Sequence, residues 1–267
     1  MQFSIITVCR NDLEGLKLTR DSIYNQSFDD FEWIVVDGNS TDGTVDWLKR
    51  LSDDNLSWTS EPDNGIFDAM NKGMLRATGN YLLFMNSFDE LADDKVLYRI
   101  NEVITGSGGR TVFIYGDSLD ITPSGDALYR KSKSHNTLWR GMFTQHQSMF
   151  FINNRDILFN TEYKITADYA YIGHHLKKAD NSDIHYVNTP VCKFKLGGTN
   201  ESYRFRALKE DFMIRRKVFG LSIFTCIVLY KLHLLHTLQK RIFPGTAKLL
   251  RYEKNENSRK ESQQNDS

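Results

Sequence analysis

Short apolar runs alternate with amphipathic stretches along the first 90 residues of the chain. Four runs rich in β-branched and aromatic residues predict strands, at residues 3–8, 31–37, 56–60 and 81–85. The stretches between them predict helices at residues 16–24, 44–51 and 68–77. Strands that alternate with helices at this spacing predict an α/β fold, with a mostly parallel sheet covered by helices on both faces.

The pattern is looser in the rest of the chain. We expect further strands at residues 112–115 and 186–191 and helices at 165–176 and 219–238. The last of these helices is mostly apolar and is flanked by basic residues at 215–217 and 240–241. We therefore expect one domain over residues 1–210 with halves at 1–110 and 111–210, a basic helical tail at 211–252, and a polar, disordered end at 253–267.

The net charge of zero conceals two regions of opposite sign. Residues 1–203 carry 20 basic and 28 acidic side chains, whereas residues 204–267 carry 14 basic and 6 acidic ones. A neutral total argues against a protein that coats nucleic acid. Three scattered cysteines without metal-ligand spacing, and a beginning that lacks the pattern of a signal peptide, predict a cytoplasmic protein with reduced thiols.

Polar side chains follow the predicted strands where each strand ends. Arg10 and Asn11 follow the first strand, Asp37 closes the second, and Asn86 and Asp89 follow the fourth. In open α/β sheets this edge binds ligands, although such loops are also polar simply because they are solvated. A carboxylate at position 37 can accept hydrogen bonds from a nucleobase or a ribose, or it can cap the next helix.

Residues 60–73, with the sequence SEPDNGIFDAMNKG, contain the densest group of candidate residues. A Pro-Asp-Asn-Gly turn leads into a helix whose first turns carry Asp68, Asn71 and Lys72. Backbone amides, a helix N-terminus and a lysine together favour a diphosphate.

The chain contains neither GxGxxG nor GxxxxGK[ST], so no motif supports a Rossmann dinucleotide site or a P-loop. The oxygen atoms of residues 86–89 suit Mg²⁺ or Mn²⁺, or they cap a helix.

These segments resemble the family 2 glycosyltransferases of GT-A fold. The likeness rests on residues 4–8, 32–38 and 60–73 and continues through residues 145–150, 167–169 and 197–199. It is greatest to the enzymes that build colanic-acid and O-antigen repeat units at bacterial polysaccharide loci. The resemblance implies a GT-A-type, Rossmann-like sheet, with the nucleotide-sugar-binding half at 1–110 and the acceptor-binding half at 111–210.

The resemblance also implies roles for individual residues. The group expected around the nucleoside comprises Thr7, Val8, Arg10, Asn11 and Asp37. The group expected along the sugar and the diphosphate comprises Asp68, Asn71, Lys72 and Asn86. Asp89 is the expected ligand of Mn²⁺ or Mg²⁺, in a motif where Asn86 and Phe88 stand in place of the aspartates of other members.

In the acceptor half, the resemblance places the catalytic base at Asp168, within Thr166-Ala167-Asp168. The other reading of Asp168 is a helix N-terminal residue favoured by the helix dipole. His146 is expected to face the acceptor or the donor sugar, or to be a structural hydrogen-bonding residue. Gly197 and Gly198 are expected to form a lid over the diphosphate, or an ordinary turn.

The predicted function is an inverting glycosyltransferase that moves a sugar from a nucleotide-diphosphate sugar to a polyprenyl-diphosphate-linked oligosaccharide in bacterial surface polysaccharide biosynthesis. A sugar-phosphate nucleotidylyltransferase would need a glycine-rich loop after the first strand, which residues 7–11 lack. A catalytically weak nucleotide-sugar or carbohydrate-binding partner in polysaccharide assembly is the alternative, because the metal motif is degraded.

The helix at 219–238 has about the length of a membrane span, but Lys231, His233 and His236 fall within it. An interfacial helix at the cytoplasmic surface of the cell membrane fits this composition better. A core-packed or dimerising helix is the alternative.

Overall fold

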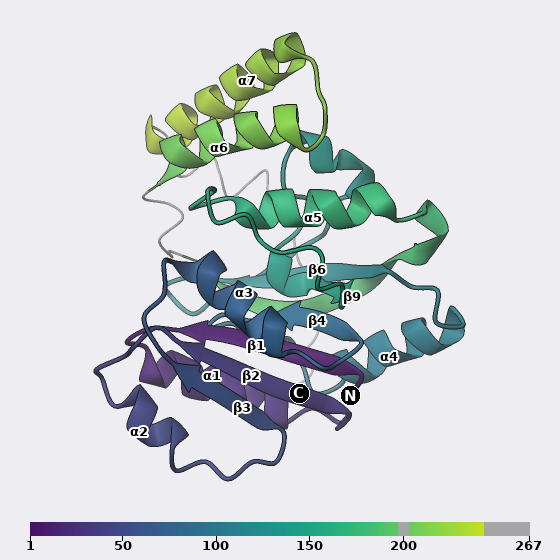
Figure 1. Cartoon of the computed structure of the whole chain (residues 1–267). Coiled ribbons are helices and arrows are strands. Elements are labelled where there is room, and N and C mark those ends of the chain that lie inside the picture. Colours follow the sequence, from purple (N-terminus) through teal and green to yellow (C-terminus); the bar gives the residue numbers. More distant parts are fainter. Residues whose placement is uncertain (197–202, 243–267) are drawn as a thin grey trace, which may run out of the picture.

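The computed structural model describes residues 1–196 and 203–242. Its centre is a single mixed sheet with the strand order β3-β2-β1-β4-β8-β6-β9-β5, with β7 paired to β6 (Figure 1). The strands are β1 (Phe3–Cys9), β2 (Phe31–Asp37), β3 (Leu56–Ser60), β4 (Tyr81–Phe84), β5 (Glu90–Leu91), β6 (Phe113–Ile121), β7 (Ala127–Arg130), β8 (Met149–Ile152) and β9 (Ile184–Lys195). The predicted α/β fold is confirmed.

The first half of the sheet is parallel, as the alternation of strands and helices predicted. β1 pairs in parallel with both β2 and β4, and β2 pairs in parallel with β3. Successive residues of β1 enter different cores, because Ile6 and Val8 pack on one face and Phe3, Ile5 and Cys9 on the other. Because these four strands are parallel, their carboxyl ends meet at one edge of the sheet.

The second half of the sheet is mixed. β8 runs antiparallel to both β4 and β6, β7 forms an antiparallel hairpin with β6, and β9 runs parallel to β6. The short β5 adds to β9 in the antiparallel sense. The short connection from β6 to β7 permits only an antiparallel pair, since a parallel pair needs a long crossover.

Helices cover both faces of the sheet. α1 (Leu13–Tyr24), α2 (Thr44–Leu48) and α4 (Val96–Gly106) pack on one face, and α3 (Ile66–Arg76) and α5 (Ala167–Lys178) on the other (Figure 1). Three short 3-10 helices complete the described chain: η1 (His135–Arg140), η2 (His146–Ser148) and η3 (Asn181–Asp183).

Two further helices stack beyond α5, away from the sheet: α6 (Arg204–Lys217) and α7 (Ile223–Ile242) (Figure 1). The boundary expected at residue 210 falls within α6, whose Ile214 and Val218 at its end join the core beneath α5. The helix expected at 219–238 begins four residues later, because Gly220 has a φ of 67° that ends the preceding helix. Among the described residues, no helix is long and apolar enough to cross a membrane.

Candidate functional site

The loops that follow β1 and β2 are joined to each other at the carboxyl edge of the sheet. The Asn11 amide donates to Ser40 Oγ at 2.7 Å, and the Thr41 amide donates to Asn11 Oδ1 at 2.8 Å. Asn11 and Asn39 have φ values of 51° and 63°, in the left-handed region that non-glycine residues rarely adopt. Strained backbone of this kind persists where the surrounding structure fixes it, and it gathers at binding sites.

Asp37 closes β2 at the centre of this edge and is fully buried. One of its oxygens accepts hydrogen bonds from the Ser40 amide at 2.9 Å and from Ser60 Oγ at 2.6 Å, and the other accepts from Ser40 Oγ. The carboxylate therefore holds the ends of β2 and β3 together. A nucleoside bound here would meet a carboxylate whose orientation is already fixed.

The other residues expected around a nucleoside divide into buried and exposed ones. Thr7 and Val8 are buried within the sheet, and Thr7 Oγ1 accepts a hydrogen bond from Trp33 Nε1 at 2.9 Å. Arg10 is exposed, and its side chain lies over Gly38. A Cβ atom at position 38 would meet the Asp63 carboxylate, which would have to move. The edge thus offers Arg10, Asn11 and backbone groups to a ligand.

Asp68 and Lys72 lie on the first two turns of α3, where the sequence placed a diphosphate. Lys72 Nζ is 2.8 Å from Glu61 Oε1 and 3.7 Å from Asp68 Oδ2, and it donates to the Pro62 carbonyl at 2.9 Å. The hydrogen bond with Glu61 raises the pKa of Lys72 above its usual value. Lys72 is therefore charged and held toward the turn that precedes the helix.

Asn71, two turns into the same helix, makes contacts that differ from the expected ones. Its side chain donates to the Phe159 carbonyl at 2.9 Å and accepts from the Phe159 amide at 2.8 Å. Asn71 thus joins α3 to the chain segment after β8. No local sequence pattern predicts this contact, because the two residues are 88 positions apart.

The turn after β4 carries Asn86 and Asp89. Phe88 has a φ of 72°, the third strained residue at this edge, and Lys195 Nζ lies 3.6 Å from the centre of its ring. The Asp89 amide donates to the Asn86 carbonyl at 3.0 Å, which closes the turn. Oδ1 of Asn86 is buried and has no hydrogen-bond partner within the described chain. An unpaired buried oxygen is costly unless a ligand or a cation meets it.

Asp89 is almost completely buried, with 4% of its surface exposed. Gln147 Nε2 donates to its Oδ2 at 2.7 Å. Burial raises the pKa of Asp89 to about 7, although the Gln147 hydrogen bond and nearby His146 act in the opposite direction. Gln147 was not predicted as a site residue. Its position next to His146, after a polar stretch, was the available sign in the sequence that it lies at the site.

His146 contacts Asp168 and lies close enough to Asp89 to affect the pKa of that carboxyl group. Its Nδ1 is 3.2 Å from Asp168 Oδ2, which is a hydrogen-bonding distance. Nε2 of the same ring is buried and has no partner within the described chain. Both side chains keep a small exposed surface, 16% for His146 and 18% for Asp168. A substrate hydroxyl can therefore approach Asp168.

Asp168 lies in the first turn of α5, after Thr166 at the N-cap. Its Oδ1 accepts a hydrogen bond from the Tyr169 amide at 2.9 Å. Burial raises the pKa of Asp211, on α6, to about 6. The nearby charge of Asp168 contributes to the rise. An acidic residue is a favourable choice in the first turn of a helix because of the helix dipole.

The donor set at Asp89 suits a shared metal ion better than a complete protein cage. Over residues 1–196 and 203–242, no three His, Cys, Asp or Glu side chains are grouped to hold a metal. Asp89 and the unpaired Asn86 oxygen supply hard oxygen donors. Mg²⁺ and Mn²⁺ commonly take one or two such ligands from the protein and the rest from phosphates and water. These residues fit an ion that a diphosphate completes.

Two expected residues, Gly197 and Gly198, lie outside the described residues. Most of the others form two groups. Arg10, Asn11 and Asp37, with Asp68 and Lys72 of α3, lie at the carboxyl edge of the parallel half, and Asn86, Asp89, His146 and Asp168 lie where the two halves of the sheet meet. Thr7 and Val8 are buried in β1, and Asn71 is bonded to Phe159.

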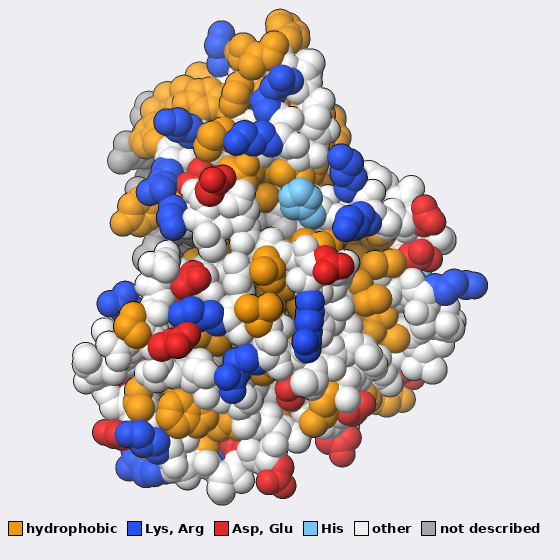
Figure 2. All heavy atoms as spheres, in the orientation of Figure 1, with side chains coloured by type: hydrophobic (Ala, Val, Ile, Leu, Met, Phe, Trp, Pro, Cys, Tyr) orange, Lys and Arg blue, Asp and Glu red, His pale blue; other side chains and the backbone are white. Residues whose placement is uncertain are grey.

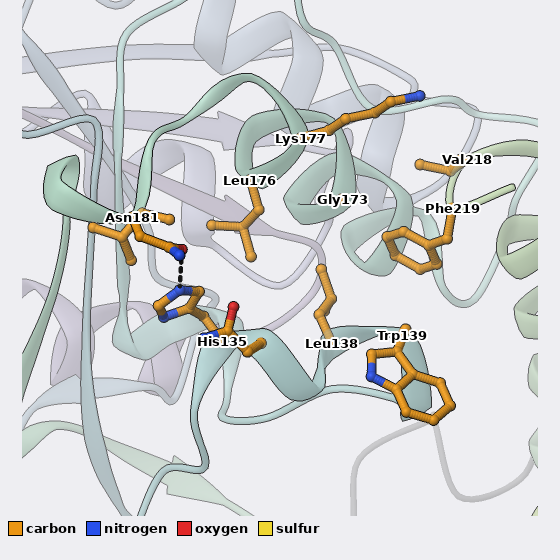
Figure 3. Close-up of a pocket in the computed structure, with 11 residues that line it drawn as sticks. His135, Leu138, Trp139, Gly173, Leu176, Lys177, Asn181, Val218 and Phe219 are labelled. Atoms are coloured by element: carbon orange, nitrogen blue, oxygen red, sulfur yellow. Dashed lines mark hydrogen bonds between the residues drawn. The ribbon is translucent and has the colours of Figure 1, made fainter. Parts of the chain in front are cut away.

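A separate cavity lies toward the other end of α5. It has a volume of about 280 Å³, and its wall includes Leu138, Trp139, Leu176 and Phe219 (Figure 3). His135 Nε2 and Asn181 Oδ1, 3.2 Å apart, lie on its rim (Figure 3). None of the residues expected to contact the donor lines this cavity.

Comparison with known proteins identifies the family of this chain and its fold. Residues 4–159 match the family described as Glycosyl transferase family 2. Over 106 residues the chain is 39% identical to an uncharacterised glycosyltransferase of Mycobacterium tuberculosis H37Rv, in an alignment that covers 39% of this chain and only 40% of that protein. Over 187 residues it is 30% identical to a PGL/p-HBAD biosynthesis glycosyltransferase of Mycobacterium bovis BCG, with 63% of this chain and 67% of that protein covered.

Two solved structures share the fold at low sequence identity. S. aureus TarS 1-349 in complex with UDP-GlcNAc aligns with a TM-score of 0.66 and 16% identity, over 88% of this chain and 72% of that one. The Pyrobaculum calidifontis mannosyltransferase PcManGT, in complex with GDP-Man and Mn²⁺, aligns with a TM-score of 0.58 and 16% identity, over 93% and 78%. The family match spans more than half of the chain, and the fold is that of GT-A enzymes. The chain belongs to glycosyl transferase family 2.

Proposed function

We propose that this glycosyltransferase moves one sugar from a nucleotide-diphosphate sugar to a hydroxyl group of a polyprenyl-diphosphate-linked oligosaccharide, with inversion at the anomeric carbon. The observation that carries the proposal is the array Asp89–His146–Asp168 at the junction of the two halves of the sheet. It combines one accessible carboxylate in a helix N-terminal turn with a second, buried carboxylate that suits a metal-bound diphosphate.

In the proposed reaction, Asp168 takes the proton of the acceptor hydroxyl while the hydroxyl oxygen attacks the anomeric carbon. The bond from that carbon to the diphosphate breaks, and the nucleoside diphosphate leaves. A single displacement of this kind inverts the anomeric centre. His146 orients the carboxylate through its Nδ1 contact at 3.2 Å.

The donor would lie along the carboxyl edge of the parallel strands. Arg10, Asn11 and the fixed Asp37 border the nucleoside, and Lys72 with the first turn of α3 borders the diphosphate. Asp89 and Asn86 would hold Mn²⁺ or Mg²⁺, which neutralises charge on the departing diphosphate. Support for the donor class comes from TarS and PcManGT, whose structures hold UDP-GlcNAc and GDP-Man.

We also propose that the protein binds the cytoplasmic surface of the cell membrane through α7. Cys226, Leu229 and Thr237 of this helix are buried. The opposite face exposes apolar side chains, with exposed fractions of 75% for Phe224 and 63% for Leu235. Lysine and arginine side chains surround these apolar groups at the same end of the molecule (Figure 2). An apolar face bordered by positive charge is typical of a helix at an anionic lipid surface, where a lipid-linked acceptor would be found.

The variant Asp168→Asn tests the proposed base. We expect full-length protein with Mn²⁺ and a bacterial lipid extract to release nucleoside diphosphate from one of a panel of nucleotide sugars. Asp168→Asn should lower that rate by about 100-fold or more while donor binding persists. Asp180→Asn, an exposed aspartate at the other end of α5, is the matched control and should be fully active.

Equal activity of Asp168→Asn and Asp180→Asn would overturn the assignment of the base. Donor binding without turnover in the unsubstituted protein would instead support the alternative function of a binding partner.

A further inference from the structure

Glu210 of α6 is a buried carboxylate that accepts hydrogen bonds from three consecutive backbone amides. Its surface is 3% exposed. Oε1 accepts from the Lys164 amide at 3.0 Å, and Oε2 accepts from the amides of Ile165 at 2.9 Å and Thr166 at 3.0 Å. Arg206, one turn earlier on α6, donates to Oε1 at 3.0 Å.

These three amides belong to the segment that leads directly into α5. The N-cap residue Thr166 makes no side-chain hydrogen bond to the first turn of its own helix. Glu210 therefore supplies from another helix an acceptor for the N-cap amide of Thr166 and for the two amides before it, and so fixes the segment from which α5 starts. Asp168 follows two residues after Thr166, so the place and direction of its side chain depend on where α5 begins.

The geometry points to a role for α6 in catalysis. We propose that Glu210 is a positioning residue: by binding the amides of residues 164–166, it sets the start of α5 and holds Asp168 in the direction of the acceptor. The role rests on the proposed function of Asp168. Glu210 would touch neither substrate nor reacting atoms and would act through the backbone of residues 164–166, to which the Thr166 hydroxyl adds a hydrogen bond of 3.4 Å.

The charge of Glu210 is part of this arrangement. Burial by itself would raise the pKa of Glu210, but the amide hydrogen bonds and Arg206 outweigh it and hold the pKa below its usual value. Ionised oxygens accept all three amide hydrogens. The side-chain amide of a glutamine would turn an NH₂ group toward one or more of these donors, which removes acceptors without a large change of volume.

The test compares Glu210→Gln with Glu162→Gln in the full-length protein. Glu162 is an exposed glutamate just before the same segment and is the matched control. In Glu210→Gln we expect kcat to fall about 10- to 100-fold, since a small displacement of a catalytic group has an effect of this size. The donor KM and the donor dissociation constant should stay within about twofold of the unsubstituted values, because the donor contacts lie on other elements. Glu162→Gln should leave all of these values unchanged.

Two further measurements separate positioning from a general structural role. Hydrogen exchange should show the amides of residues 164–166 protected in the unsubstituted protein and faster in Glu210→Gln. In an Asp168→Asn background, Glu210→Gln should cause no further loss of the residual activity, because both changes act on one group. If Glu210→Gln does not fold, Glu210→Asp, which keeps the charge on a shorter side chain, is expected to show the same pattern to a smaller extent.

If Glu210→Gln has the same kcat as the unsubstituted protein, the proposal is overturned. It is also overturned if donor binding is lost in parallel with kcat, or if Glu210→Gln causes an additive loss of activity in the Asp168→Asn background. Full activity of Asp168→Asn would instead overturn the proposed base, while the exchange of the three amides would still report whether Glu210 holds this segment.

Discussion

At the scale of single residues, the contact between His146 and Asp168 explains how two positions far apart in the sequence form one site. A carboxylate in a helix N-terminal turn can rotate about its side-chain bonds, and a hydrogen bond to its outer oxygen selects one orientation. His146 Nδ1 is placed to make that bond, 3.2 Å from Asp168 Oδ2. In the proposed reaction the imidazole is therefore an orienting group, and the proton acceptor is the carboxylate.

Substitution of His146 tests this orienting role. His146→Ala removes the contact, and we expect kcat to fall by about 10-fold or more because Asp168 loses its fixed orientation. His146→Asn places an amide nitrogen near the position of Nδ1 and should retain most of the activity. Steady-state kinetics with a saturating donor would measure both. Equal loss in the two variants would show that the Nδ1 contact is not what matters.

Which residues could be predicted from the sequence depended on how local their contacts are. Asp89, His146 and Asp168 were identified because short motifs mark them, and the structure brings them together. Glu210 could not be found in this way, since it binds amides that lie 44 to 46 positions earlier. No local pattern distinguishes a buried glutamate of this kind from the solvated ones on a polar helix.

At the scale of elements, the parallel strands were predictable because their apolar runs are short, rich in β-branched and aromatic residues and bounded by turn residues. β5 and β7 have only two and four residues and were not predicted. α6 was missed for a different reason. It is polar around most of its circumference and buries charged side chains, Glu210 and Arg215, so it has no apolar stripe that a sequence pattern would reveal.

The link between α3 and the segment after β8 gives a prediction at this scale. Asn71 pairs with both backbone groups of Phe159, whose ring packs against Phe67 and Tyr171. Asn71→Ala leaves a carbonyl and an amide without partners, and we expect the free energy of unfolding to fall by about 2 kcal/mol. Denaturant titration would measure this. Asn64→Ala, at an exposed position before the same helix, is the control, and a loss of equal size there would contradict the account.

At the scale of the whole molecule, α6 connects the proposed site to the proposed membrane surface. Glu210 binds the start of α5, and the fully buried Arg215 donates to the carbonyls of Trp139 and Arg140 and lies 3.5 Å from His233 of α7. Arg215 thus joins α6 to η1 and lies against α7. A lipid-linked acceptor could reach Asp168 from the same surface that α7 presents.

Vesicle binding tests the apolar face of α7. The double variant Phe224→Asp, Leu235→Asp places two negative charges on that face, and we expect it to lose flotation with anionic vesicles that the unsubstituted protein binds. Leu18→Asp, at a 45% exposed leucine of α1, is the matched control and should still bind. Binding that survives in the double variant would show that another surface meets the membrane, and a change of oligomeric state instead would favour a dimerising helix.

The most direct test of the central claim, a single displacement assisted by Asp168, is the anomeric configuration of the transferred sugar. The full-length protein would be incubated with Mn²⁺, a nucleotide sugar of known configuration and a lipid-linked acceptor, and the product examined by NMR. If transfer is a single displacement, the transferred sugar in the product has the anomeric configuration opposite to that of the donor. A product that retains the donor's configuration would contradict this mechanism.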